Sequence, residues 1–125
     1  MNRNEWTVLV VEDEYDSQQM VSKILNYHGV NVRLAQNGQQ CLEYLDQHVP
    51  TIIVTDLAMP EMDGWDTLTA VRSNPATAHI PVVAITAFHS AELAEDALLA
   101  GFDACYSKPI DPRTFVDKLS ELLTA

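Results

Sequence analysis

Acidic side chains at two places in the sequence could together bind a metal ion. Glu12 and Asp13 follow the apolar run that starts at Thr7, and Asp56 ends the apolar run that starts at Thr51. Carboxylates brought together repel one another unless a cation joins them, and a site built only of oxygen ligands suits a hard divalent ion. Mg²⁺ fits because it takes one or two carboxylates and leaves positions for phosphoryl oxygens. These acids therefore indicate a magnesium site that can hold a phosphoryl group.

Three side chains could act on that phosphoryl group directly. The Asp56 carboxylate could attack phosphorus as a nucleophile, Lys108 could neutralise a phosphoryl oxygen, and the Thr86 hydroxyl could donate a hydrogen bond to another. Each also has an ordinary interpretation, because threonine is common in strands, Lys108 precedes a proline in a loop, and a run of acids often starts a helix. In combination they predict a covalent phosphorylation site at Asp56.

Five short apolar runs alternate with longer segments of helical period, which is the pattern of strands joined by helices. The runs begin at Thr7, Val30, Thr51, Pro81 and Ala104. The first, third and fourth are continuously apolar, as in parallel strands covered on both faces, whereas the second alternates and the fifth is short, as in edge strands. We predict an α/β fold with a flavodoxin-like, doubly wound, five-stranded parallel sheet in the order 2-1-3-4-5 and helices on both faces.

The predicted sheet brings the reactive side chains to one edge. In open sheets of this kind, ligands bind beyond the carboxyl ends of the strands, where the strand order reverses. The first and third strands flank that point, so Glu12 and Asp13 should lie beside Asp56, with Thr86 and Lys108 at the ends of the next two strands. The acids, the hydroxyl and the ammonium group are therefore expected to converge.

Turn and capping residues mark the ends of the predicted helices. Gly29 and Gly101 each follow a segment of helical period and mark helix C-termini. Asn37 is a predicted N-cap, and Asp111 is a predicted cap with Pro112 as the first helical residue. These boundaries place helices in the connections between the strands.

The composition bounds the kind of protein. The 125 residues are 47% hydrophobic, which suffices for a core, and we predict a single domain over residues 1–125. Seven basic against 18 acidic residues give a formal net charge of −11, which disfavours nucleic acids and anionic membranes as partners. A polar N-terminus and the lack of an apolar run of roughly 20 residues predict a cytoplasmic protein without membrane insertion. Cys41 and Cys105 are expected to be reduced core thiols, and the four histidines, which lack ligand spacing, are expected at the surface.

Four stretches of the chain, VVEDE, VTDLAMPEMDG, AITA and SKPID, resemble the ordered motifs of the response-regulator receiver domain of two-component signalling, in particular single-domain receivers of the chemotaxis-regulator type. The resemblance covers essentially the whole chain. It implies that Asp56 is phosphorylated from a phosphohistidine on a histidine kinase or a histidine phosphotransfer protein. It also implies a domain that catalyses only its own phosphorylation and dephosphorylation. Such a domain would signal to a downstream protein target as a monomer or a weak, phosphorylation-dependent dimer.

The resemblance also assigns the metal ligands. Asp13 and Asp56 would bind Mg²⁺ directly, and the backbone carbonyl of Ala58 would be the third protein ligand. Glu12 would act through water, and it stands where an aspartate is commoner in the family. The longer side chain is therefore expected to affect only a water-mediated contact.

The same resemblance makes Thr86 the switch hydroxyl and predicts a cis bond between Lys108 and Pro109 that directs the lysine into the site. Cys105 departs from the family pattern, because many members carry an aromatic residue three positions before the lysine, and here Tyr106 comes one position later. A shift of one residue along a strand moves a side chain to the opposite face. Activation is therefore expected to act through Thr86 and its loop, with Tyr106 keeping one rotamer.

The positions two residues beyond Asp56 and Thr86 hold Ala58 and Phe88. In the family, side chains at these positions influence how water reaches the phosphorus. Ala58 has no polar atom to orient a water molecule, and Phe88 offers no hydrogen bond. A bulky Phe88 ring over the site would cover the approach of water, whereas a ring that points outward as a docking residue would leave the site open. We therefore expect slow loss of the phosphoryl group.

Two other classes of protein fit parts of this pattern. A Mg²⁺-dependent small-molecule phosphatase could also use an aspartate nucleophile, but the haloacid-dehalogenase type needs a second acid two residues later, where this chain has Ala58. A flavodoxin-like module that binds a flavin or a nucleotide would need a loop rich in Gly, Ser or Thr after the first strand. This chain has acids there, which repel phosphate. The receiver interpretation accounts for all four motifs.

Overall fold

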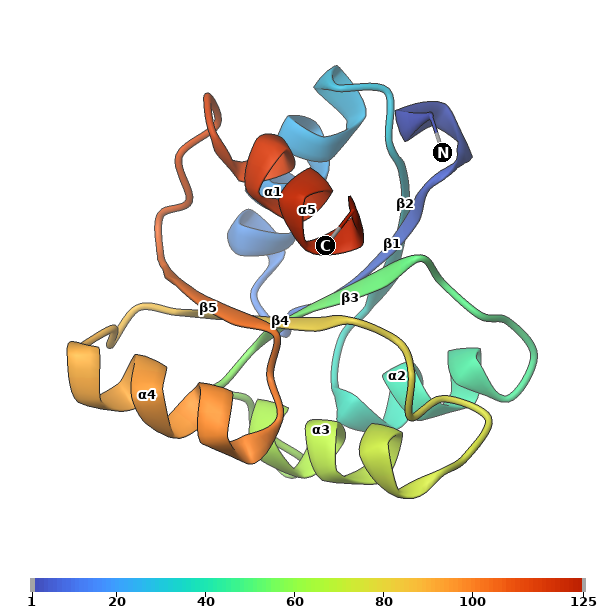
Figure 1. Ribbon diagram of the computed structural model, residues 1–125, viewed down its shortest axis with the longest axis vertical. Helices are drawn as coiled ribbons and strands as arrows, with labels where there is room; N and C mark the ends of the chain where they lie inside the picture. The colour runs from blue at the N-terminus through green and yellow to red at the C-terminus, as the bar shows by residue number, and fades with distance from the viewer. Residues whose placement is uncertain (1, 125) are drawn as a thin grey trace.

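A parallel sheet of five strands runs through the middle of the molecule in the computed structural model, which describes residues 2–124 (Figure 1). In chain order the strands are β1 (Thr7–Val11), β2 (Asn31–Ala35), β3 (Ile52–Asp56), β4 (Val82–Thr86) and β5 (Ala104–Ser107). They lie in the order β2-β1-β3-β4-β5, and every neighbouring pair is parallel. The predicted strand order is confirmed, and the three continuously apolar runs form the inner strands.

Within residues 2–124, five α-helices cover the sheet on both faces. On one face lie α1 (Tyr15–Tyr27) and α5 (Phe115–Thr124), and on the other lie α2 (Gly38–Leu45), α3 (Gly64–Ser73) and α4 (Ala91–Ala100) (Figure 1). A short 3₁₀ helix, η1 (Arg3–Glu5), precedes β1. This doubly wound arrangement is the flavodoxin-like fold expected from the sequence. In the part of the chain that the structure describes, no helix combines the length and apolar character needed to cross a lipid bilayer.

Alternate residues of the inner strands pack into two separate core layers. In β1, Val8 and Val10 join the layer beneath α1 and α5, whereas Leu9 and Val11 join the layer above α3 and α4. All four side chains are completely buried. Burial on both faces explains why the sequence of each inner strand is apolar throughout. Each such side chain contributes roughly 1.5–3 kcal/mol when fully buried, so the inner strands are strongly anchored.

The predicted glycine and asparagine boundaries of the helices are confirmed. Gly29, after α1, has a φ of 82°, and Gly101, at the end of α4, has a φ of 118°. Residues with a Cβ atom rarely adopt this conformation, which allows the chain to leave each helix. At the start of α2, the side chain of Asn37 accepts a hydrogen bond from the backbone N–H of Gln40 (2.8 Å).

The start of α5 differs from the prediction. The helix begins at Phe115, not at Pro112, because residues 112–114 form a turn. The carbonyl oxygen of Asp111 accepts the N–H of Phe115 (3.0 Å), so Asp111 still leads the chain into the helix. The carbonyl oxygen of Pro112 lies 3.4 Å from Nε2 of His28, at the end of α1. The turn before α5 therefore makes a contact with a residue far away in the sequence, which the local sequence pattern does not predict.

Arg72, near the C-terminus of α3, ties several connections together. Its guanidinium group donates to the carbonyl oxygens of Ala78 (3.1 Å), Ile80 (2.6 Å) and Gly101 (3.0 Å) and to the carboxylate of Asp103 (3.0 Å). The same carboxylate accepts the first N–H of β4 (2.8 Å). These bonds join the connection from α3 to β4 with the connection from α4 to β5, so one side chain stabilises the approach to two strands.

Replacing Arg72 with methionine keeps a long side chain but removes the donors. Three carbonyl groups and one carboxylate then lose the guanidinium donor, so we expect Arg72→Met to lower the free energy of unfolding by about 2 kcal/mol. Arg113→Met is the matched control, because Arg113 is 86% exposed and pairs with Asp111 at the surface. Exposed pairs of this kind contribute about 0–1 kcal/mol. Urea unfolding measures both variants, and equal losses would contradict the role assigned to Arg72.

Candidate functional site

Three carboxylates meet beyond the carboxyl ends of β1 and β3. Glu12 and Asp13 follow β1, and Asp56 is the last residue of β3. One carboxylate oxygen from each residue lies within 4.8 Å of the other two. Glu12 and Asp56 are buried, with 0% and 7% of their surface exposed, whereas Asp13 is exposed. The acids that the strand order was expected to bring together are therefore adjacent.

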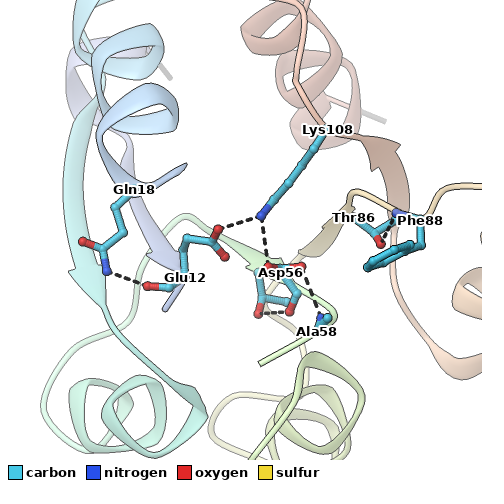
Figure 2. A network of polar contacts seen from close by, with 8 residues as sticks. Glu12, Gln18, Asp56, Ala58, Thr86, Phe88 and Lys108 are labelled. Carbon is cyan, nitrogen blue, oxygen red and sulfur yellow. Dashed lines mark hydrogen bonds and ion pairs between the residues drawn. The ribbon is translucent and has the colours of Figure 1, made fainter. Parts of the chain in front are cut away.

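Lys108 bridges two of these carboxylates (Figure 2). Its Nζ donates to Oε1 of Glu12 (2.6 Å) and to Oδ2 of Asp56 (3.0 Å), and its side chain is only 17% exposed. The residue follows β5, and its backbone N–H donates to the carbonyl oxygen of Thr86 (2.8 Å) at the end of β4. The peptide bond between Lys108 and Pro109 is cis, as predicted. The ammonium group of Lys108, which follows β5, thus lies between the ends of β1 and β3.

Burial and neighbouring charges shift the pKa values of both partners. Burial raises the pKa of Glu12 from 4.5 to about 7, the neighbouring carboxylate of Asp56 adds to the increase, and the contact with Lys108 opposes it. Burial alone would lower the pKa of Lys108, but its bonds to Glu12 and Asp56 outweigh burial and hold that pKa above its ordinary value. Glu12 therefore binds a proton more readily than an exposed glutamate does, as expected for a buried acid beside another acid.

The donor set fits a hard divalent cation. Oε2 of Glu12 is buried and has no hydrogen-bond partner among the described residues. When every group is ionised, three carboxylates and one ammonium group leave a net charge of −2, which a divalent ion would neutralise. All the candidate side-chain ligand atoms are oxygens, which Mg²⁺ prefers. The N–H of Ala58 donates to Oδ1 of Asp56 (3.2 Å), so the Ala58 backbone lies beside that carboxylate, and ligation by its carbonyl stays a prediction.

Thr86 ends β4 at the same edge of the sheet (Figure 2). Asp56 pairs with Ile85 in the register of β3 and β4, so Thr86 lies one residue further along. Thr86 is 1% exposed, and its Oγ1 accepts the N–H of Phe88 (3.1 Å), which leaves the hydroxyl hydrogen free to donate. Phe88 is 76% exposed. The ring of Phe88 therefore points outward to solvent and does not cover the site.

Gly64 allows the start of α3 to lie against the backbone that carries Asp56. A Cβ atom at position 64 would lie 2.4 Å from the carbonyl oxygen of Asp56 and 2.9 Å from the Cα of Leu57. The N–H of Gly64 also donates to the carbonyl oxygen of Leu57 (3.1 Å). Glycine is therefore required here by close approach of two backbone segments. In the same loop Glu61 has a φ of 66°, which is uncommon for a residue with a side chain.

Gln18 is a buried polar neighbour of the site that sequence reasoning missed. It lies on the face of α1 that also buries Val21, Ser22 and Leu25. Its Nε2 donates to the backbone carbonyl oxygen of Glu12 (2.5 Å) (Figure 2). A glutamine that shares the spacing i, i+3, i+4, i+7 with apolar residues is a signal that could have indicated burial. That signal does not identify the partner, which lies in the preceding loop.

Cys105 and Tyr106 contact opposite core layers, as predicted for neighbouring residues of β5. The centroids of the Tyr106 and Phe115 rings are 6.1 Å apart in an edge arrangement, and Nζ of Lys118 lies 5.1 Å from the Tyr106 centroid. Both cysteines are free thiols. Three of the four histidines are exposed and His28 is partly buried, which largely confirms their expected surface positions.

The chain is similar to known signalling proteins over most of its length. The profile of the response regulator receiver domain family matches residues 8–120. An uncharacterized 14.6 kDa protein of Leptolyngbya boryana is 36% identical over 105 residues, which are 84% of this chain and 80% of that protein. The transcriptional regulatory protein ZraR of Escherichia coli K12 is 37% identical over 112 residues, which are 89% of this chain but 25% of that protein. The structure of chemotaxis response regulator CheY4 of Vibrio cholerae matches with a TM-score of 0.84 and 28% identity, over 94% of this chain and 98% of that chain.

The raised pKa of Glu12 predicts that, without Mg²⁺, the protein loses stability as the pH rises. Between pH 4.5 and about 7 the unfolded chain releases the Glu12 proton while the folded protein keeps it. The folded state then binds more protons, so the free energy of unfolding falls with increasing pH. The stabilisation is complete below pH 4.5 and is lost as the pH passes about 7. Its size should be about 3 kcal/mol.

Urea unfolding in the presence of a chelator, from about pH 5 to about pH 8, measures this slope. Glu12→Gln should flatten the profile, whereas Glu14→Gln, which alters an exposed acid two residues away, should keep it. Adding Mg²⁺ at the upper end should stabilise the wild type, because a cation favours ionised carboxylates in the folded state. A Glu12→Gln profile as steep as the wild-type profile would show that another group titrates.

Proposed function

The chain belongs to the response regulator receiver domain family of two-component signalling, and we propose that Asp56 is its phosphoacceptor. The observation that carries this proposal is the position of Lys108, whose ammonium group contacts Asp56 (3.0 Å) and Glu12 (2.6 Å) at once. A positive charge therefore lies against a carboxylate that would bear a phosphoryl group, next to acids that suit a divalent ion.

The proposed donor is a phosphohistidine on a histidine kinase or a histidine phosphotransfer protein. An oxygen of the Asp56 carboxylate attacks the phosphorus in line, an O–P bond forms, the P–N bond to the imidazole breaks, and the released nitrogen takes up a proton. Lys108 can transfer its hydrogen bond from Asp56 to a phosphoryl oxygen, since it already lies 3.0 Å from Oδ2. Thr86 has a hydroxyl hydrogen for another phosphoryl oxygen, because Oγ1 acts as an acceptor towards Phe88.

We propose that Asp13 and Asp56 bind Mg²⁺ directly, that the carbonyl of Ala58 is the third protein ligand, and that Glu12 acts through water. When bound, the ion offsets the negative charge of the acids and of the phosphoryl oxygens. The spacing of the three carboxylates within 4.8 Å supports this assignment, and so does Oε2 of Glu12, which has no hydrogen-bond partner within residues 2–124.

Two alternative functions explain less of the site. A phosphatase with an aspartate nucleophile would need an acid–base group beside Asp56, and the side chain at the required position is the methyl group of Ala58. A flavodoxin-like module would bind phosphate or flavin at the loop after β1, where Glu12 and Asp13 present negative charge. The flavodoxin-like module also gives no role to the contacts of Lys108 with both Glu12 and Asp56.

We further propose that residues 1–125 form one receiver domain, which acts in the cytoplasm on a downstream protein target and not on nucleic acid. Beyond its own phosphorylation and dephosphorylation it would catalyse no reaction, and it would be a monomer or a weak, phosphorylation-dependent dimer. The signal would pass through Thr86 and its loop to the exposed Phe88. Tyr106 would keep its rotamer, because Phe115 and Lys118 already contact its ring.

Acetyl phosphate with Mg²⁺ tests the assignment of Asp56. We expect one phosphoryl group per chain at saturation, complete loss of labelling in Asp56→Asn, and unchanged labelling in Asp46→Asn, which alters an exposed aspartate at the end of α2. Mass spectrometry of the intact protein measures the occupancy. Continuous release of inorganic phosphate without labelled protein would favour the phosphatase, and full labelling of Asp56→Asn would place the phosphoacceptor elsewhere.

The phosphoryl group on Asp56 should be lost slowly, because Ala58 and Phe88 provide no polar atom to orient an attacking water. Combining Ala58→Asn with Phe88→Glu supplies such atoms and should speed the loss by about tenfold or more. Decay of phosphorylated protein in Mg²⁺, after removal of the donor, gives the rate. The matched control combines Ala100→Asn with Leu99→Glu, two exposed positions of α4, and should decay like the wild type. Equal rates for all three proteins would refute the explanation.

A further inference from the structure

The amide of Gln18 is buried in the first turn and a half of α1 and points at the loop that carries two of the acids. Gln18 is 6% exposed, and its Nε2 donates to the backbone carbonyl oxygen of Glu12 (2.5 Å) (Figure 2). We propose that Gln18 is a positioning residue for the metal site. It would hold the peptide between Glu12 and Asp13 so that both carboxylates stay directed at Asp56. The proposal rests on the function proposed above.

The hydrogen bond from Gln18 restrains the backbone of Glu12 on the side that β2 does not hold. The N–H of Glu12 donates to the carbonyl oxygen of Ala35 (2.9 Å), which extends the pairing of β1 and β2 by one residue. Gln18 holds the carbonyl oxygen of the same residue, and the backbone N–H of Gln18 donates to the carbonyl oxygen of Glu14 (2.9 Å) as α1 begins. Glu12 is thus held at both backbone polar groups. The orientation of the peptide between Glu12 and Asp13 sets the direction in which the side chain of Asp13 points.

Restraint matters here because the side chains involved repel one another. The carboxylates of Glu12, Asp13 and Asp56 lie within 4.8 Å, and Lys108 contacts only Glu12 and Asp56. Asp13 is exposed, so a free backbone would let it turn towards water and away from the other two acids. A ligand that is already in place binds a metal more tightly than one that must first be ordered. Loss of a group that orients a metal ligand typically weakens metal binding by about 10–100-fold.

The same face of α1 offers a matched comparison. Ser22 lies one turn after Gln18, is 8% exposed, and its hydroxyl has no hydrogen-bond partner among the described residues. Ser22→Ala therefore removes a buried polar atom without removing a tether. Gln18→Met keeps the length of the side chain and removes the donor. A purely structural role would change the free energy of unfolding but not the affinity of the folded protein for Mg²⁺.

Calorimetric titration with Mg²⁺ alone, under conditions in which each protein is folded, tests the proposal. We expect Gln18→Met to bind Mg²⁺ about tenfold more weakly and Ser22→Ala to bind like the wild type. Backbone hydrogen exchange at Glu12, whose N–H donates to the carbonyl oxygen of Ala35, should be faster without metal in Gln18→Met only. If Gln18→Met does not fold, Gln18→Asn shortens the reach by one methylene and should weaken binding in the same direction.

The possible failures can be told apart. Wild-type affinity in Gln18→Met or Gln18→Asn would overturn the positioning role and leave the proposed function standing. Equal weakening in Ser22→Ala would also overturn it, because the effect would then belong to the packing of α1. A wild-type protein that binds no Mg²⁺ would overturn the proposed function itself, and with it the inference about Gln18.

Discussion

The ammonium group of Lys108 lies between two buried carboxylates that would otherwise repel each other, at 2.6 Å from Glu12 and 3.0 Å from Asp56. Like charges this close are tolerated only when a cation joins them or a proton neutralises one of them. Both responses are visible, because Lys108 contacts each acid and the pKa of Glu12 is raised to about 7 by burial and by Asp56. Lys108 therefore neutralises only part of the negative charge of the carboxylates, and a divalent cation would neutralise the rest.

The fold serves mainly to hold these charges where they are. Inner strands that are buried on both faces have a fixed register, so the last residue of β3 and the residues after β1 reach the same edge of the sheet. Gly64 lets α3 start directly against the backbone of Asp56, and Lys108 is brought back over the site by the connection after β5. Apolar packing on both faces of the sheet thus stabilises the fold enough to offset the charge repulsion at the edge of the sheet.

Family membership and geometry support each other at different levels of detail. The match to the receiver domain over residues 8–120 identifies the class of protein. The geometry then locates three residues of this chain around the site, which are the buried Glu12, Ala58 two residues after Asp56, and the exposed Phe88 two residues after Thr86. These residues bear on charge balance and on water access, which are the quantities that set how readily a phosphoryl group is accepted and how long it stays.

The sequence by itself determined the strand order, the face of each β5 side chain, and the edge at which the acids, Thr86 and Lys108 gather. These features follow from the spacing of apolar residues, from turn-forming glycines such as Gly29, and from the rule that parallel strands end on one side of a sheet. Such signals are local, because they depend on backbone conformation and on periodicity within a few residues.

Only the tertiary structure decided that Gln18 holds the carbonyl of Glu12, that α5 starts at Phe115 after a turn whose Pro112 carbonyl lies near His28, and that residue 64 must lack a Cβ atom. It also decided that Oε2 of Glu12 has no hydrogen-bond partner in the described part of the chain and that Phe88 points to solvent. Each of these facts depends on how two distant segments cross, to within a fraction of an ångström. The physical reason is that a hydrogen bond or a steric clash changes from favourable to unfavourable over such a distance, whereas the apolar pattern that selects the fold tolerates larger shifts.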